Sequence, residues 1–347
     1  MQIERNRYIT HLLLTICLLC ASVIDSLSAQ DAVEAPSQYM EGRGVFFRIS
    51  GNGLEHPSYI LGTVHTFPGD FALHVPGLME VYDSIGQVAC ERKIIASQWS
   101  NDDSLPSPDE MREIFDIHES KYQRSNGKMR LFLDDLTARE ADRCKGALNI
   151  ELGIRDRELW TFKYLFTHIT SVYEERIHDL FLNYGLDLHE TGISFDEYLY
   201  SVMASRYNLP VIELDEEKTE KEVKASRKKD FDLLFDKKAR RKDLSKLLCS
   251  NIVYYGDHFR STQIQAEEYI KGSKIPGLLT DTSDRSDTDA RNHLWMTKLP
   301  TLFQQTPTLV VVGLFHLHDS NHGEGILHQL ERMGFVVERL NTTEFFL

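Results

Sequence analysis

Two histidines stand in the same local pattern at distant points of the chain. Each follows an apolar run of strand-forming residues, a glycine and two further residues: SYILGTVH ends at His65 and TLVVVGLFH ends at His316. This pattern would deliver an imidazole to the carboxyl end of a buried strand, the edge where open α/β sheets usually hold their chemistry. About 0.8 Gly-x-x-His spacings are expected by chance in this composition, and the two other copies, at 53–56 and 325–328, follow no strand. Strand context therefore selects His65 and His316.

Glu91 could complete a site with these two imidazoles. A strand is predicted over residues 87–92, and Glu91 stands at its carboxyl end. If this strand neighbours the other two, the three side chains converge and offer a divalent metal two nitrogens and one oxygen, with positions left for water and substrate. Such a metal lowers the pKa of water and polarises a carbonyl, which is hydrolytic chemistry. In the alternative interpretation, the histidines bond to loop carbonyls and Glu91 pairs with Arg92 or another surface charge.

The elements that must position these residues are predicted at both ends of the chain. Those of the first half are a strand at 45–50, a turn at 51–53, a strand at 59–64 and a helix between Pro76 and Gly86. Those of the second half are a strand at 309–312, a loop, a helix at 325–333 and a strand at 335–340. The predicted fold class is therefore α/β (α+β), with a central mixed β-sheet flanked by helices.

The middle of the chain, from about 105 to 305, has mainly helical patterns. The elements predicted there are helices at 108–115, 156–166, 172–182 and 195–207, and a short strand at 209–214. Between 215 and 246, charges of both signs interrupt one another, which favours the solvated face of long helices over a basic docking patch. We therefore expect one domain over 43–341, with a large helical insertion between the two halves of its sheet.

The N-terminal residues have the pattern of a secretory signal. Two arginines precede an apolar segment over about 9–24, which is shorter than the roughly 20 residues needed to cross a bilayer. Cleavage near Ala29 would release an exported protein, periplasmic or extracellular, without a stable membrane span. The expected parts are a signal peptide over 1–29 and a disordered lead-in over 30–42. A membrane anchor and a lipid-modified Cys20 are the alternatives.

Charge and cysteine content narrow the classes of function. The 39 basic and 53 acidic residues give a net charge of −14, which argues against a nucleic-acid or anionic-membrane binder. Only Cys90, Cys144 and Cys249 remain after removal of the signal, and no Cys-x-x-Cys spacing for zinc is left among them. Cys90 stands in an apolar run and is expected to be a buried hydrophobe. If a disulfide forms, it joins Cys144 to Cys249.

The chain resembles the TraB/PrgY/GumN family, which includes the Tiki-type membrane metalloproteases and is distantly similar to erythromycin-esterase-like and haem-uptake ChaN-like proteins. The resemblance covers most of residues 43–341. Its motifs are SYILGTVH, a strand ending at Glu91, FDEYL at 195–199, PVIELD at 210–215, Arg291-Asn292 in a helix, VGLFHL around His316, and GFVVE at 334–338. What it implies is a metal-dependent, hydrolase-like site with manganese or cobalt as the metal; zinc is a further possibility.

The same resemblance assigns roles to two regions near the end of the chain. Arg291 becomes a candidate for orienting a carboxylate or stabilising developing negative charge, whereas a salt bridge within its own helix is the alternative. The loop after the second histidine is longer than the family pattern leads one to expect. Its polar residues His318, His322 and Glu324 could supply an extra ligand or only decorate the loop.

The sequence thus predicts an exported, metal-dependent hydrolase that acts on a peptide or amide substrate. His65, Glu91 and His316 are the predicted metal ligands, and these three together with Arg291 are the predicted catalytic residues. Two alternatives remain open: a non-catalytic protein that sequesters a peptide or envelope ligand, and a haem or metal carrier that uses the two histidines. Turnover in the presence of bound metal would distinguish the enzyme from both.

Overall fold

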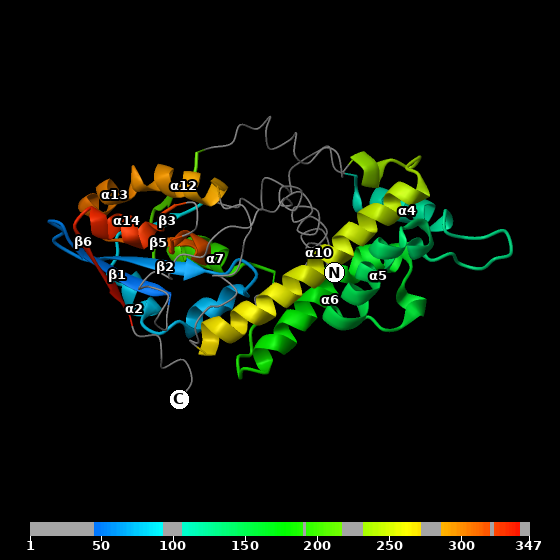
Figure 1. The fold of residues 1–347 in the computed structure, drawn as a ribbon, viewed down its shortest axis with the longest axis horizontal. Helices are drawn as coiled ribbons and strands as arrows, with labels where there is room; N and C mark the ends of the chain where they lie inside the picture. The colour runs from blue at the N-terminus through cyan, green and yellow to red at the C-terminus, as the bar shows by residue number, and fades with distance from the viewer. Residues whose placement is uncertain are drawn as a thin grey trace. The chain divides into compact units, whose positions relative to one another are not determined.

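The computed structural model describes most of the chain between residues 45 and 340. The described ranges are 45–92, 106–189, 192–216, 232–271, 286–319 and 323–340. The expected signal peptide (1–29) and lead-in (30–42) lie outside them. The described residues form two compact units (Figure 1), of which unit 1 contains 106–179 and 232–261 and unit 2 contains the rest. The stretch 43–341, expected as one domain, is therefore described as two units.

Unit 2 is built on a six-stranded mixed sheet with the strand order β4-β3-β5-β2-β1-β6. The strands are β1 (Phe46–Gly51), β2 (Ser58–Thr63), β3 (Gln87–Cys90), β4 (Val211–Glu213), β5 (Thr308–Gly313) and β6 (Phe335–Arg339). The pairs β4–β3, β3–β5 and β5–β2 are parallel, whereas β1 is antiparallel to both β2 and β6. The predicted α/β class with a central mixed sheet is confirmed, and the strands before Glu91, His316 and His65 are the neighbours β3, β5 and β2.

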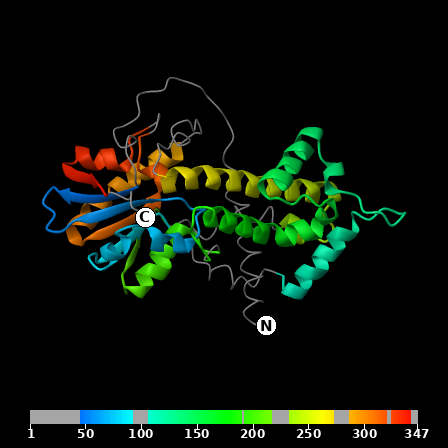
Figure 2. The same cartoon turned by 90° about the horizontal axis from the view of Figure 1, so that it is seen from below.

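Helices cover both faces of this sheet. They are η2 (Gly69–His74), α2 (Leu78–Tyr82), α7 (Phe195–Glu197), η6 (Tyr198–Met203), α8 (Ala204–Arg206), α12 (Ser286–Met296), α13 (Leu299–Gln305), η7 (Leu314–His316) and α14 (Ile326–Arg332). The connections β2–β3 and β3–β4 cross the sheet in one direction, and β4–β5 and β5–β6 cross it in the other. Because such crossovers are right-handed, the two sets lie on opposite faces. Figure 2 shows α12 and α14, in orange and red, on one side of the strands, and α2 and α7, in cyan and green, on the other.

The hairpin at the start of the sheet forms as predicted. Gly51, Asn52 and Gly53 all have positive φ angles, of 76°, 46° and 80°, a region that suits glycine and tolerates asparagine. The turn brings β2 back beside β1 and into the interior of the sheet. All six residues of β5 and five of the six in β2 are buried, as expected for parallel strands covered on both faces.

Unit 1 is helical and forms part of the predicted helical middle (about 105–305), the rest of which belongs to unit 2. Its elements are α4 (Pro108–Ser120), η3 (Phe132–Asp135), α5 (Ala138–Gly146), η4 (Ala147–Glu151), η5 (Arg157–Leu159), and most of α6 (Phe162–Leu182) and α10 (Arg241–Lys271), which both end in unit 2. Ser107 and Thr137 begin α4 and α5 with capping boxes. In the core, Tyr122 stacks on Phe162 and Phe162 on Phe166, with ring centroids 5.7 Å apart in both pairs. Unit 1 therefore has a hydrophobic core of its own.

Two predictions for the helical region were wrong in their boundaries. Separate helices were expected at 156–166 and 172–182, whereas a short 3-10 turn precedes one continuous helix, α6. The expected break falls on a segment rich in Thr and His, which have modest helix propensity, but Phe166 and Ile169 are buried there and packing overrides propensity. The helix expected at 108–115 continues to Ser120. Within the described residues, no helix is both long and apolar enough to cross a bilayer.

Candidate functional site

Three neighbouring strands end at the same edge of the sheet of unit 2. The register pairs Thr63 with Gly313 and Cys90 with Val311, so β2, β5 and β3 finish within about two residues of one another. At their amino ends, Ser58 Oγ accepts a hydrogen bond from the backbone N–H of Thr308 at 3.0 Å, which helps to fix this register. The residues that follow these strand ends therefore meet at one place.

The side chains of His65, Glu91 and His316 do converge there. Glu91 Oε1 lies 3.9 Å from His65 Nε2 and 3.7 Å from His316 Nε2. The same oxygen accepts a hydrogen bond of 2.6 Å from the backbone N–H of Gly313, the last residue of β5. The carboxylate is thus anchored to the central strand and faces the Nε2 atom of each imidazole.

Gly313 leaves open the space between these three side chains. A Cβ atom at this position would lie 3.1 Å from His65 Nε2, 3.2 Å from Glu91 Oε1 and 3.7 Å from His316 Cδ2. The glycine of the second Gly-x-x-His motif is therefore required for space rather than for its backbone conformation, because its φ of −55° suits other residues. It keeps a small volume at the centre of the cluster free of protein atoms.

Asp196 holds the outer nitrogen of His65. Asp196 Oδ2 lies 3.1 Å from His65 Nδ1, and its carboxylate is mostly buried whereas half of the imidazole is exposed. The backbone N–H of Phe195 donates to the carbonyl of Phe67 at 2.9 Å, which ties the start of α7 to the turn after β2. Ser194 caps that helix. These contacts place Asp196 beside His65, so that Nε2 of the imidazole is directed towards Glu91.

Asn292 contacts Nδ1 of His316, as Asp196 contacts Nδ1 of His65. Its side-chain Nδ2 donates to the carbonyl of His316 at 3.2 Å, which leaves Asn292 Oδ1 to accept a hydrogen bond of 2.7 Å from His316 Nδ1–H. The proton therefore resides on Nδ1, and Nε2 carries a lone pair. The indole of Trp295, one turn further along α12, packs on the imidazole with ring centroids 4.3 Å apart. The ring of His316 is buried and fixed on three sides.

Arg291 is joined to the cluster by nearly all of its donors. Its Nη2 donates to Glu91 Oε2 at 2.5 Å and to Asp215 Oδ2 at 3.0 Å, and its Nε donates to Asp215 Oδ1 at 3.1 Å. Its Nη1 lies 3.3 Å from His316 Nε2, and the guanidinium stacks over Trp295 at 4.8 Å. These contacts favour a role for Arg291 in positioning Glu91 over a role in binding a substrate carboxylate.

The electrostatics of the cluster separate the two histidines. The charge of Asp196 and its hydrogen bond, helped by Glu91, raise the pKa of His65 to about 9 against the effect of burial. Burial, reinforced by Arg291 and His65, lowers the pKa of His316 to about 4. Burial alone would raise the pKa of Glu91, but both histidines and Arg291 lower it overall. At neutral pH, His65 is protonated, His316 is neutral and Glu91 is ionised.

We predict that the two imidazoles titrate far apart in the metal-free protein. Proton NMR of the ring C–H signals should show His65 titrating near pH 9 and His316 near pH 4. Asp196→Asn should lower the pKa of His65 towards its ordinary value, because the variant removes the largest cause of the shift. Asp319→Asn, which removes the carboxylate 3.1 Å from His328 Nδ1, is the matched control and should leave His65 unchanged.

The signs of the linked stability effects differ between the two groups. The pKa of His65 is raised, so its pairing stabilises the fold fully below about pH 6.5, and this contribution is lost as pH rises through about 9. The pKa of His316 is lowered, so the free energy of unfolding falls as pH drops from about 6.5 to about 4. If the NMR signal of His65 gave the same pKa in wild type and in Asp196→Asn, the assigned pairing of His65 with Asp196 would be wrong.

Two other polar residues that the sequence singled out, Arg92 and Glu324, pair with side chains other than the three predicted ligands. Arg92 lies 3.7 Å from Asp215 rather than beside Glu91. Glu324 pairs with Arg332 on α14, and His318 is buried, while His322 lies outside the described residues. The predicted set His65, Glu91, His316 and Arg291 is thus brought together.

Three supporting residues were missed as functional candidates. Asp215 follows β4 at the same edge of the sheet, so the strand-end rule that selected Glu91 would also have found it. Asn292 stands next to Arg291 on α12, but no sequence rule pairs it with a distant imidazole. Asp196 lies in the first turn of a helix, where an acidic residue is ordinarily explained by the helix dipole. Its approach to His65 depends on the tertiary contact between Phe195 and Phe67.

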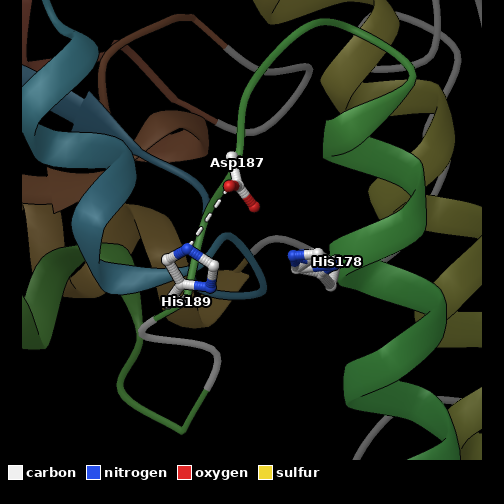
Figure 3. A group of neighbouring side chains, drawn as sticks. All are labelled: His178, Asp187 and His189. Atoms are coloured by element: carbon white, nitrogen blue, oxygen red, sulfur yellow. Dashed lines mark ion pairs between the residues drawn. The ribbon is translucent and has the colours of Figure 1, made fainter.

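A separate pair of polar side chains lies in the segment after α6. Asp187 Oδ2 is 3.5 Å from His189 Nε2 in an exposed ion pair, which Figure 3 draws with a dashed line. The backbone N–H of His189 also donates to Asp70 Oδ2 at 2.7 Å. His178, drawn in the same figure, belongs to unit 1 and lies on α6. Asp187 and His189 by themselves offer fewer ligands than the three that a catalytic metal site usually takes from its protein.

Fold and site together define an α/β protein with a His–Glu–His cluster at the carboxyl edge of a mixed sheet. Comparisons of the chain with models of known protein families, with curated proteins and with solved structures give no match. The argument for a function therefore rests on the geometry and chemistry of the cluster.

Proposed function

We propose that this protein is a metal-dependent hydrolase of peptide or amide bonds, with His65, Glu91 and His316 as the ligands of a divalent cation. One observation carries the proposal: Nε2 of both imidazoles faces the same carboxylate oxygen, at 3.9 Å and 3.7 Å. Hydrogen-bond partners on Nδ1 of ligand histidines are a general feature of metal sites. Here Asp196 and Asn292 supply them.

The donor set fits a divalent cation. Two imidazole nitrogens and one carboxylate oxygen are the protein ligands of several hydrolytic metal sites, and manganese, cobalt or zinc would accept them. The space that a Cβ on Gly313 would fill is bordered by atoms of all three residues. The chemistry that such a cation supplies when bound is Lewis acidity, which lowers the pKa of water and polarises a carbonyl.

The residues of the chain have distinct parts in this proposal. His316 carries a lone pair at Nε2 at neutral pH, because its pKa is about 4 and its proton is on Nδ1. Arg291 Nη1, 3.3 Å away, donates to this lone pair and would have to release it to a cation. His65 must first lose its proton, since its pKa is about 9, so cation affinity should rise with pH up to that value. Glu91 is held by Gly313 and Arg291, and Arg291 keeps this carboxylate ionised and in place. The half-exposed face of His65 is the side from which a substrate would enter.

Metal binding by histidine variants tests the ligand set. We expect His65→Ala and His316→Ala each to weaken the affinity for manganese or cobalt at least about tenfold, because each variant loses one of three protein ligands. Isothermal titration calorimetry measures the affinities. His328→Ala is the matched control, since His328 lies on α14 in the same unit and pairs with Asp319. Its affinity should equal that of wild type.

Turnover is the second measurement. Cleavage of a mixed peptide library, followed by mass spectrometry with manganese, cobalt or zinc present, should occur with wild type and be lost in both ligand variants. Tight metal binding without any cleavage would replace the hydrolase with a metal carrier. Peptide binding that needs neither metal nor turnover would favour a sequestering protein. Unchanged metal affinity in both variants would exclude His65 and His316 as ligands.

A further inference from the structure

Two cysteines that are distant in sequence lie together in the core of unit 1. Cys144 is on α5 and Cys249 is on α10, and both belong to the same cluster of buried side chains. Cys144 is fully buried, and Cys249 nearly so. Cys90, the third cysteine of the described residues, lies on β3 in unit 2 and is also buried. Unit 1 therefore holds one candidate pair of thiols, and unit 2 holds a single thiol.

The contacts of the two sulfur atoms show how close they are. The thiols of Cys144 and Cys249 lie close enough for each to shift the pKa of the other, upwards at Cys144 and downwards at Cys249. Cys249 Sγ also lies 3.7 Å from the carbonyl oxygen of Glu140, which is one helical turn before Cys144 on α5. A disulfide needs its two sulfur atoms at a distance of about 2.05 Å. α5 and α10 bring both thiols into the same part of the core, from which the sulfur atoms can make this approach.

We propose that Cys144 and Cys249 form a disulfide when the protein folds under oxidising conditions. The oxidant is a disulfide, either glutathione disulfide or the active-site disulfide of a thiol oxidoreductase. The thiolate of one cysteine attacks this disulfide and displaces one thiolate from it, and the thiolate of the second cysteine then attacks the mixed disulfide. Two protein thiols are oxidised, one disulfide is reduced to two thiols, and the protein loses two hydrogen atoms.

The burial of both sulfur atoms determines when during folding this exchange takes place. The folded core excludes an attacking disulfide from both sulfur atoms, so the first exchange precedes the final packing of α5 against α10. The link then closes a loop of about 100 residues and constrains the unfolded chain strongly. Because both sulfur atoms lie in unit 1, outside the sheet that carries the His–Glu–His cluster, we expect the disulfide to affect stability rather than metal binding.

Peptide mapping of the full-length protein tests the proposal. The protein is refolded with reduced and oxidised glutathione, denatured, alkylated and digested without reduction. We expect a cross-linked peptide pair that contains Cys144 and Cys249, with Cys90 alkylated. The melting temperature should fall by about 5–15 °C when the same protein is refolded under reduction.

The variant Cys249→Ala provides the matched control for the thermal measurement. It should melt at the same temperature with and without reductant, because it cannot form the link. Should this variant fail to fold, mapping of the wild type still decides the question. Complete alkylation of both Cys144 and Cys249 after oxidative refolding, or a cross-link from either one to a different cysteine, would overturn the proposal.

Discussion

Glu91→Gln is expected to reduce metal-dependent turnover about a thousandfold or more. The variant replaces the carboxylate that faces both imidazoles with a neutral amide, which is a poorer ligand and accepts no proton. It also turns an amide towards Arg291, which donates to Glu91 Oε2 at 2.5 Å in wild type. Rates of peptide cleavage and isothermal titration with manganese measure the two losses separately.

Folding of this variant has to be followed together with its activity. The buried hydrogen bonds from Gly313 and Arg291 to Glu91 are weakened by the substitution, so we expect a loss of about 1–3 kcal/mol in the free energy of unfolding. Glu338→Gln is the matched control, because Glu338 pairs with Arg48 on the exposed edge of the same sheet. Equal cleavage by wild type and Glu91→Gln would remove Glu91 from the reaction.

The sheet was predictable because its strands are short, apolar and bounded by turn residues. All strands of the final topology had been expected within two residues at either end, including the hairpin turn at 51–53. The predicted site was conditional on the strands before His65, Glu91 and His316 being neighbours, and the pairing of β2 and β3 with β5 meets that condition. Local sequence and global fold agree in this part of the chain.

The helical unit was less predictable because its boundaries depend on packing. α10 has 31 residues, yet its first part had been recognised only as a tract of mixed charge. Its buried side is set by contacts with α5 and α6 that are distant in sequence, as for Leu248 and Ile252. The chain also passes from unit 1 back into unit 2 twice, after residue 179 and after residue 261. No local sequence pattern indicates these two crossings.

The cluster itself was predictable at its centre and not at its periphery. His65, Glu91 and His316 follow strands, so one rule about the carboxyl edge of a sheet found all three. Asp196 and Asn292 come from helices, and their contacts with the imidazoles depend on how those helices cross the sheet. Helix placement is a tertiary property, which explains why Asp196 and Asn292, although they stand in motifs of the family resemblance, were not assigned to the histidines.

Gly313→Ala is expected to abolish tight metal binding while the fold is retained. The added Cβ would lie 3.1 Å from His65 Nε2 and 3.2 Å from Glu91 Oε1, so it would occupy the space that the two ligand atoms border. The backbone needs no change, because the φ of −55° at this position is ordinary for alanine. We expect manganese affinity to fall at least about a hundredfold and cleavage to fall with it, as measured by isothermal titration and peptide mass spectrometry.

Gly146→Ala is the matched control for this substitution. Gly146 ends α5 in unit 1, and a Cβ there meets no atom within 4 Å, so that variant should bind metal and cleave peptide as wild type does. The three atoms nearest to the added Cβ belong to side chains of the cluster rather than to the backbone. The melting temperature of Gly313→Ala should therefore stay within a few degrees of wild type. Wild-type metal affinity in this variant would show that the cation does not bind between His65 and Glu91, and the ligand set proposed for the site would then be wrong.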